Sequence, residues 1–238
     1  ELRVESPMFN LRLFKIRPFA TGSVAGLLAA IARGGMQFML IIWLQGIWLP
    51  LHGYSFEDTP LWAGIYLLPL TAAFLVAGPL SGFLSDRFGA RTFATGGLVV
   101  VAFSFLGFAL LPTDFHYWAF AALLVVNGVG SGLFSAPNTT GIMNSVPANQ
   151  RGAASGMRST FFNSGTSLSI GVFFSLMIVG LASTLPHTLT AGLQSHAVPA
   201  ALAEKIGSAP PVGSLFAAFL GYDPVRSLLG PQALASLP

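Results

Sequence analysis

The sequence TFATGGLVVVAFSFLGFALL, residues 92–111, contains no charged side chain. A helix needs about 20 mostly apolar residues to cross the hydrocarbon core of a bilayer, and this stretch supplies them. Further apolar runs without Asp or Glu cover residues 19–50, 60–84, 117–143 and 152–184. Because lipid cannot hydrogen-bond an open backbone, such runs must be helical. The sequence therefore predicts an all-α, polytopic membrane protein with about five transmembrane helices.

The overall composition supports the same conclusion. Hydrophobic residues make up 53% of the 238 residues and charged residues only 8%, whereas soluble domains carry about 25% charged residues. The net charge of +3 comes from arginines spread over loops rather than from one basic face, so we expect no nucleic-acid partner. Cysteine is absent from the sequence, which excludes disulfides and thiolate metal sites.

The positions of the basic residues predict the orientation. The segments 51–59 and 112–116 contain no Lys or Arg, whereas the other connections do, and basic loops face the cytoplasm. We therefore predict a multi-pass protein of the cell membrane, inner or plasma, with a cytoplasmic amino end. The basic residues expected on the cytoplasmic side are Arg3, Arg12, Lys15, Arg17, Arg87, Arg91 and Arg151.

The chain is predicted to have three parts. Residues 1–18 form a cytoplasmic segment, residues 19–184 a five-helix transmembrane half-domain, and residues 185–238 an external segment rich in Pro and Ala. Within the last segment, residues 212–222 are apolar but too few to span a bilayer. They form either a short interfacial or re-entrant helix or a loop with one apolar patch. The odd number of helices suggests that the chain is a piece of something larger.

The most specific local sequence is Gly82-Phe-Leu-Ser-Asp86-Arg87-Phe-Gly89-Ala-Arg91, which follows the second apolar run. We expect Gly82 to let two helices approach, and Gly89 to permit a tight reversal of the chain. Asp86 is predicted near the start of the third helix, where the helix dipole favours an anion. Arg87 and Arg91 either pair with Asp86 or a helix end, or are ordinary positive-inside anchors.

This loop resembles the motif Gly-x-x-x-Asp-Arg/Lys-x-Gly-Arg/Lys-Arg/Lys of the major facilitator superfamily. Ala90 departs from it, because the family has a basic residue there. In that family the loop joins the second and third helices of each six-helix half and helps control the transition between inward- and outward-facing states. The resemblance implies a conformational-switch role for the matching residues, which are Gly82, Asp86, Arg87, Gly89 and Arg91.

Two flanking segments, residues 10–19 and 146–156, resemble the carboxyl-terminal half of fourteen-helix drug:proton antiporters. By this resemblance the five runs correspond to helices nine to thirteen, and residues 185–238 to the external loop before a final helix. The implied partners are the lipid bilayer, a small-molecule substrate and the missing half of the transporter.

Polar residues within the apolar runs form stripes. On the fourth run Asn127, Ser131, Ser135 and Asn138 share one helix face, and on the fifth run Asn163 lies on a similar face. Amides in lipid need partners, so these faces should point into the bundle. The residues either hold helices together or line a substrate cavity, and the cavity candidates are Asn127, Asn138 and Asn163.

Arg33 is predicted to lie near the bilayer centre, where an arginine costs about 2.5–3.5 kcal/mol on insertion scales. Gln37 follows one turn later on the same face, and both are candidates for the substrate cavity. We expect Arg33 to find a partner, namely a carboxylate, helix-end carbonyls or the substrate. The alternative is that its side chain snorkels to the interface, and Arg158 is expected to be such an anchor. Candidates for an apolar pocket are Phe38, Phe74, Phe161 and Phe162.

By the resemblance to drug:proton antiporters, the predicted function is part of a secondary active transporter that exports small amphiphilic compounds or drugs, by proton antiport and alternating access. The apolar runs hold no carboxylate or His in their interiors, so a titrating group would lie in the other half. The alternatives are a truncated, non-transporting membrane interaction module and a uniporter or symporter of the same fold. Without a phosphate loop, a His cluster or a nucleophile elbow, we expect no enzyme, no catalytic residue, no cofactor and no metal.

Overall fold

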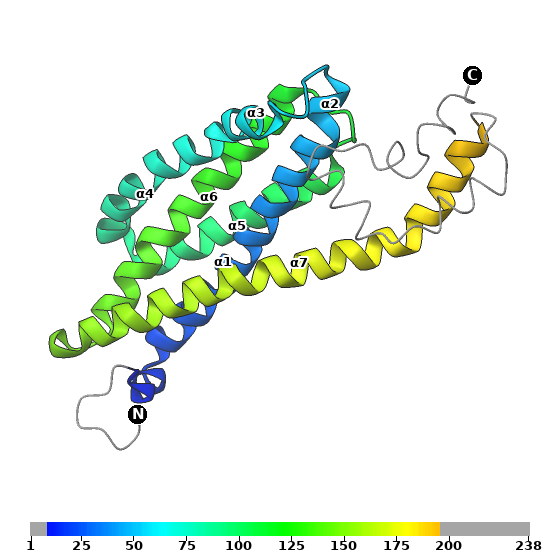
Figure 1. Ribbon diagram of the computed structural model, residues 1–238. Helices are drawn as coiled ribbons and strands as arrows, with labels where there is room; N and C mark the ends of the chain where they lie inside the picture. The colour runs from blue at the N-terminus through cyan, green and yellow to red at the C-terminus, as the bar shows by residue number, and fades with distance from the viewer. Residues whose placement is uncertain (1–8, 196–238) are drawn as a thin grey trace. The chain divides into compact units, whose positions relative to one another are not determined.

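The computed structural model describes residues 9–195, and within this range the chain forms helices joined by short turns. Five helical segments are long and apolar enough to cross a membrane. They are Arg17–Leu51, Thr59–Phe88, Ala90–Leu110, Tyr117–Asn144 and Ala148–Gly192 (Figure 1). This confirms the predicted all-α, polytopic membrane fold. The predicted short helix at residues 212–222 and the position of Arg3 lie outside the described residues.

The elements follow one another with few irregular residues between them. They are the 3-10 helix η1 (Leu11–Lys15), α1 (Arg17–Trp43), the π-helix η2 (Leu44–Trp48), α2 (Leu49–Leu51), α3 (Thr59–Tyr66), α4 (Leu68–Phe88), α5 (Ala90–Leu110), α6 (Tyr117–Asn144), the 3-10 helix η3 (Ala148–Gln150) and α7 (Arg151–Ser195).

Prolines explain why two of the predicted helices are interrupted. Pro50 follows the π-helical stretch, and Pro69 lies in the first turn of α4, directly after the break at Leu67. Proline lacks an N–H and clashes with the preceding turn, which favours a widened or broken turn just before it at these two positions, although α4, α6 and α7 continue through Pro79, Pro137 and Pro186. The apolar pattern predicts the length of each span but does not show these local breaks.

By the packing of its residues the chain divides into two compact units, which share α1 and α7. The first unit comprises the chain up to Gln37 together with Leu61–Ser169, and the second comprises Phe38–Pro60 and the chain from Ile170.

In the first unit α6 packs against α4 on one face and α5 on another (Figure 1). Glycines make both contacts close. A Cβ atom at Gly132 would lie 2.7 Å from Ala77 Cβ in α4, and one at Gly97 would lie 2.6 Å from the Gly130 carbonyl oxygen of α6. Without a hydrophobic driving force between helices in lipid, close packing of small residues is a main source of association energy.

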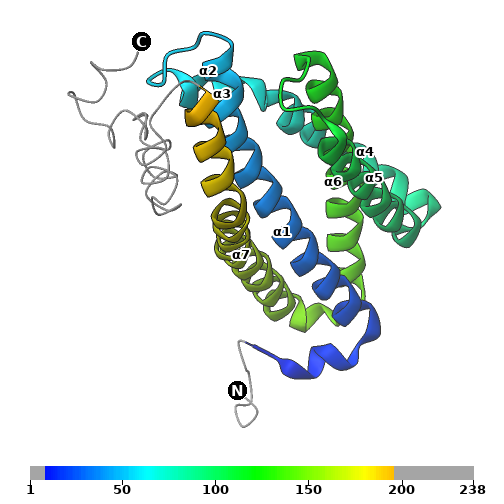
Figure 2. The ribbon, with the colours of Figure 1, turned by 90° about the vertical axis from the view of Figure 1, so that its right-hand side faces the viewer.

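The first unit also contains the lower part of α1 and the beginning of α7, which lie side by side (Figure 2). A Cβ atom at Gly165 of α7 would lie 3.0 Å from the Leu27 carbonyl oxygen and 3.1 Å from Ala30 Cβ of α1. Where both helices begin, a buried apolar cluster joins them to η1 and α6. Its buried members are Leu13, Phe19, Ile142, Val146, Ala154 and Met157.

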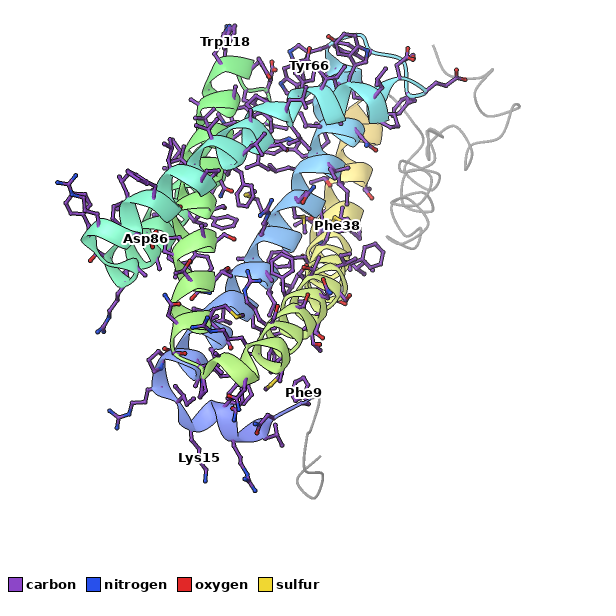
Figure 3. The ribbon with its side chains drawn as sticks, turned by 90° about the vertical axis from the view of Figure 1, so that its left-hand side faces the viewer. Phe9, Lys15, Phe38, Tyr66, Asp86 and Trp118 are labelled. Carbon is purple, nitrogen blue, oxygen red and sulfur yellow. The ribbon has the colours of Figure 1, made fainter. Side chains whose placement is uncertain are left out.

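The Trp and Tyr residues of the first unit lie at the end opposite to Lys15. Tyr66 and Trp118 are at one end, and Lys15 is at the other (Figure 3). The ring centroids of Tyr66 and Tyr117 are 4.7 Å apart, and those of Trp62 and Tyr66 are 6.0 Å apart. This separation is typical of a membrane protein, in which Trp and Tyr gather at an interface and basic residues mark the cytoplasmic side.

In the second unit Phe38 packs edge-on against Phe174, with ring centroids 6.2 Å apart (Figure 3 labels Phe38). Trp48 is only 5% exposed and stacks on His52, with ring centroids 4.0 Å apart. Helix α7 continues to Ser195, past the apolar run that ends at residue 184. The hydroxyl groups of Thr188 and Thr190 donate to carbonyls four residues earlier, so helical structure persists where the apolar run has ended.

Candidate functional site

A cavity of about 400 Å³ lies within the first unit and is lined by α1, α5, α6 and the first part of α7. Most of its walls are apolar side chains, and its polar residues are few. They are Ser23, Arg33, Asn127, Ser131, Ser135, Asn138 and Arg158.

Arg33 lines this cavity from the middle of α1 and is partly buried. Its guanidinium carbon lies 4.5 Å from the centre of the Phe74 ring of α4, which is a cation–π contact. No ion pair or hydrogen bond joins Arg33 to another of the described residues. The partner of Arg33 in this part of the chain is therefore an aromatic ring, rather than the carboxylate or helix-end carbonyls that the sequence suggests.

Two of the predicted cavity residues do not lie in the cavity. Gln37 and Asn163 are both exposed, and neither is among the described residues that line it. Gln37 follows Arg33 at a helical spacing of four, which puts the two residues roughly 40° apart around the axis. Because Gln37 is rotated by this angle and lies one turn further along α1, its side chain does not reach the cavity.

The two predicted asparagines of α6, Asn127 and Asn138, do line the cavity, and both also hold helices together. Asn127 is 1% exposed, and its Nδ2 donates to Ser104 Oγ of α5 at 2.7 Å. The Nδ2 of Asn138 donates to the Gly22 carbonyl oxygen of α1 at 3.1 Å. Each residue therefore combines a helix contact with a position on the cavity wall.

A second cavity, of about 730 Å³, adjoins the first and lies toward the end of the unit where α1 and α5 begin. Asn138 and Leu98 line both cavities. The second cavity is also lined by Arg17 of α1 and Arg91 of α5. Arg91 thus belongs both to the predicted motif and to a cavity wall.

Of the four phenylalanines predicted for an apolar pocket, Phe161 and Phe162 line the first cavity. Phe74 instead lies under Arg33, and Phe38 packs on Phe174. The α7 pair lines the cavity because it follows Arg158 by three and four residues, which is one helical turn.

The motif region corrects one prediction. Residues from Gly82 to Phe88 are helical and belong to α4, and the reversal into α5 is made at Gly89 alone, with φ +95°. Asp86 therefore lies in the last turn of α4 rather than at the start of the third helix (Figure 3). The prediction is wrong because no Gly or Pro lies between Gly82 and Gly89, so α4 continues to Phe88.

The predicted ion pairs of this motif are absent from the part of the chain that the structure describes. Asp86, Arg87 and Arg91 are all exposed, and the Arg87 guanidinium lies 5.6 Å from the centre of the Phe88 ring. Gly82 is partly buried, and a Cβ atom added there would lie 3.9 Å from Ala136 Cβ of α6. The exposed carboxylate and arginines are available to groups outside these residues.

Sequence reasoning misses two residues of the cavity. The sequence predicts an anchor role for Arg158, yet this residue lines the first cavity. Ser23 is 3% exposed, and its hydroxyl has no hydrogen-bond partner among residues 9–195. A single serine in an apolar stretch of α1 forms no polar stripe, so the sequence holds no signal for it. No cluster of three or more potential metal ligands occurs in the described region.

The chain is similar to several transport proteins over most of its length. It is 29% identical over 198 residues to the methyl viologen resistance protein SmvA of Salmonella typhimurium, covering 83% of this chain and 38% of the relative. It is 29% identical over 220 residues to the tetracenomycin C resistance and export protein of Streptomyces glaucescens, covering 90% and 39%. It is 31% identical over 212 residues to the multidrug efflux pump LfrA of Mycolicibacterium smegmatis, covering 89% and 40%.

The chain thus spans about two fifths of the length of these relatives. No solved structure matches it significantly. Residues 3–170 match the family described as the Major Facilitator Superfamily, and this region includes the cavities and the Gly82–Arg91 motif. The chain belongs to the Major Facilitator Superfamily.

Proposed function

We propose that the chain forms one half-bundle of a secondary active transporter that exports small amphiphilic compounds or drugs. The observation that carries this proposal is the apolar cavity with a small set of polar residues, because such cavities suit small-molecule ligands. The names of the relatives, which include resistance, export and efflux proteins, support the same class of function.

The proposed mechanism is alternating access. The two halves of such a transporter rock against each other around a site near the bilayer midplane. In this proposal the residues that line the first cavity form one wall of that site. The missing half of the transporter supplies the other wall. Residues 19–184 act as the transmembrane half-domain, between a cytoplasmic segment at 1–18 and an external segment at 185–238.

The α4–α5 corner is proposed as the conformational switch. Asp86 and Arg87 end α4, Gly89 makes the turn, and Arg91 begins α5, all within one exposed corner. Exposed charges can form ion pairs in one conformation and break them in another at modest cost, because the surface energies involved are about 0–1 kcal/mol per pair. The arginines of this corner support its cytoplasmic location in the cell membrane, since basic loops are enriched on that side.

Proton antiport is the proposed driving force, with the titrating group in the other half. Within residues 9–195 the cavity walls hold no carboxylate or His, so these walls cannot take up and release a proton at neutral pH. A uniporter or symporter would have the same walls, and a non-transporting module would need no cavity.

Transport in proteoliposomes tests this function. The complete reading frame that contains these 238 residues is reconstituted, and efflux of a fluorescent amphiphile is followed with and without a pH gradient. We expect efflux to depend on the gradient and to slow by about tenfold in Asp86→Asn, with the external variant Asp58→Asn as the matched control. Efflux that ignores the gradient would indicate a uniporter or a symporter for another ion, and no efflux at all would favour the interaction module.

A further inference from the structure

The charges around the two cavities have one sign. Arg33 and Arg158 line the first cavity, and Arg17 and Arg91 line the second. Among the described residues that line either cavity, none is Asp or Glu. Charges of one sign along low-dielectric walls concentrate the field and raise the local concentration of the opposite charge. The path from the second cavity into the first is therefore electropositive.

Arg33 has hydrogen-bonding capacity that the described residues do not use. A guanidinium carries five N–H donors, and an arginine near the bilayer centre is costly unless it finds partners. The cation–π contact with Phe74 offsets part of this cost. The ring occupies a face of the guanidinium and leaves its N–H edge without an acceptor among these residues. An anion is the acceptor that a guanidinium binds most strongly.

Ser23 provides an independent observation at the same cavity. Its side chain is buried and lines the cavity, and its hydroxyl is the buried side-chain polar group that has no hydrogen-bond partner in the described region. Leaving such a buried group unpaired is unfavourable, because it has lost its hydrogen bonds to water. Most other buried serines of the chain donate to a carbonyl, as Ser81 does to Gly132. An O–H donor without a partner among these residues, in the same cavity as Arg158 and Arg33, suits a ligand that accepts hydrogen bonds.

We propose that the cavity selects amphiphilic organic anions, that is, compounds with an aromatic or other apolar body and one carboxylate or sulfonate group. The proposal rests on the transport function proposed above and names its substrate class. Arg158 and Ser23 at one depth, or Arg33 deeper in the membrane, hold the anionic group, while Phe105, Phe134 and Phe161 contact the apolar body. The volume of about 400 Å³ fits a ligand of this size.

The two arginines of the first cavity lie at different depths. Gly165 packs against Leu27 and Ala30, which fixes the register of α7 against α1. Counting back from Gly165, Arg158 lies near the level of Ser23, roughly 15 Å below Arg33 at a rise of about 1.5 Å per residue. A small monoanion therefore meets Arg158 first and Arg33 deeper in the membrane. Each arginine should contribute separately to affinity.

Binding of three matched probes tests the charge preference. The full 238-residue chain is placed in phosphatidylcholine nanodiscs and titrated with 2-naphthalenesulfonate, 2-naphthalenesulfonamide and 2-naphthyltrimethylammonium, which share one ring system. Empty nanodiscs give the lipid background. We expect the sulfonate to bind at least about tenfold more tightly than the trimethylammonium probe, as a charge-assisted contact would give.

Arginine variants locate the source of this preference. Arg33→Gln and Arg158→Gln should each lower the preference several-fold, the double variant should abolish it, and Arg33→Lys should keep part of it. Arg12→Gln is the matched control, because Arg12 is exposed and lines neither cavity. Circular dichroism of each variant checks that the helices are intact, and Arg158→Gln serves if Arg33→Gln does not fold.

The outcomes separate this inference from the proposed function. Equal binding of the three probes, tighter binding of the cation, or an unchanged preference in the double variant would overturn the anion inference. The same titration on the complete reading frame must keep the preference, since its loss there would mean that carboxylates elsewhere neutralise the arginines. Sulfonate binding without any efflux would overturn the transport function alone, and efflux of cations only would overturn the anion inference alone.

Discussion

Polar groups within the first unit are treated differently in two regions. Where α6 meets α4 and α5, they are paired: Ser81 donates to Gly132, and Asn127 donates to Ser104. Where α1 and α7 line the cavity, Ser23 lacks a partner within residues 9–195 and Arg33 contacts a ring. A polar residue in a membrane helix can therefore either join helices or be available to a ligand. Whether it already has a protein partner distinguishes the two roles.

The largest expected effect is on transport and concerns the cavity region of α1 and α7, because substitutions in the packed region should affect stability instead. Arg33→Leu should reduce efflux by the complete transporter at least about tenfold, because the charged donor is lost. Insertion and stability should be retained, since removing a charge from the bilayer centre relieves a cost of about 2.5–3.5 kcal/mol. Efflux from proteoliposomes and protease protection in membranes measure the two quantities. Efflux equal to that of the unaltered protein would show that Arg33 has no role at the site.

The packed region should respond to a single added methyl group. In Gly97→Ala the Cβ atom would lie 2.6 Å from both the Gly130 carbonyl oxygen and the Phe134 amide nitrogen, so the backbone of α6 must move. We expect a loss of about 3 kcal/mol in the free energy of unfolding, the upper range for overpacking. Titration from dodecyl maltoside into sodium dodecyl sulfate micelles measures it.

Gly96→Ala is the matched control, because nothing lies within 4 Å of a Cβ atom there. It should leave stability unchanged or raise it by up to about 1 kcal/mol, since alanine is the better helix former. Similar losses at both positions would mean that helix propensity, and not close contact with α6, explains the effect.

The sequence is sufficient for the membrane fold because that fold depends on a summed property. A run of about twenty apolar residues must be helical in lipid whichever neighbours it has, so the spans follow from composition and length. The breaks at Leu67 and at the π-helical stretch depend instead on single prolines. Asp86 lies one helix earlier than the sequence predicts because only Gly89 ends α4.

The candidate site is less predictable, because it depends on which helix faces meet. The spacing of Asn127 and Asn138 predicts their position, and the cost of a charge in lipid singles out Arg33. Arg158 lies near a helix start, where an arginine is usually an anchor, and Ser23 is an ordinary small residue of a helix. Their role arises only from the packing of α7 on α1, which no local pattern contains.

The hydrogen bond between Asn127 and Ser104 should contribute less to the free energy of unfolding than the close contact at Gly97. Asn127→Leu removes it, and we expect a loss of about 1–2 kcal/mol, because one buried hydrogen bond contributes roughly that amount. Ser104 also donates to the Val101 carbonyl oxygen at 2.7 Å, so it is not left unpaired. Unfolding of both single variants and of Asn127→Leu with Ser104→Ala forms a double-mutant cycle. Additive losses would show that the bond contributes nothing to stability.

The smallest expected effect is on the free energy of unfolding, and it is found by comparing two buried serines, one from each region. Ser81→Ala removes a hydroxyl that donates to the carbonyl oxygens of Gly78 and Gly132 at 2.8 and 2.9 Å, and should cost about 1 kcal/mol. Ser23→Ala removes a hydroxyl without a partner in the described region, and should raise the free energy of unfolding by about 1 kcal/mol while weakening sulfonate binding. If the two substitutions change the free energy of unfolding in opposite directions, Ser81 joins helices, whereas Ser23 is available to a ligand. If Ser23→Ala destabilised the chain as Ser81→Ala does, Ser23 would have a structural partner and could not be counted as part of the anion site.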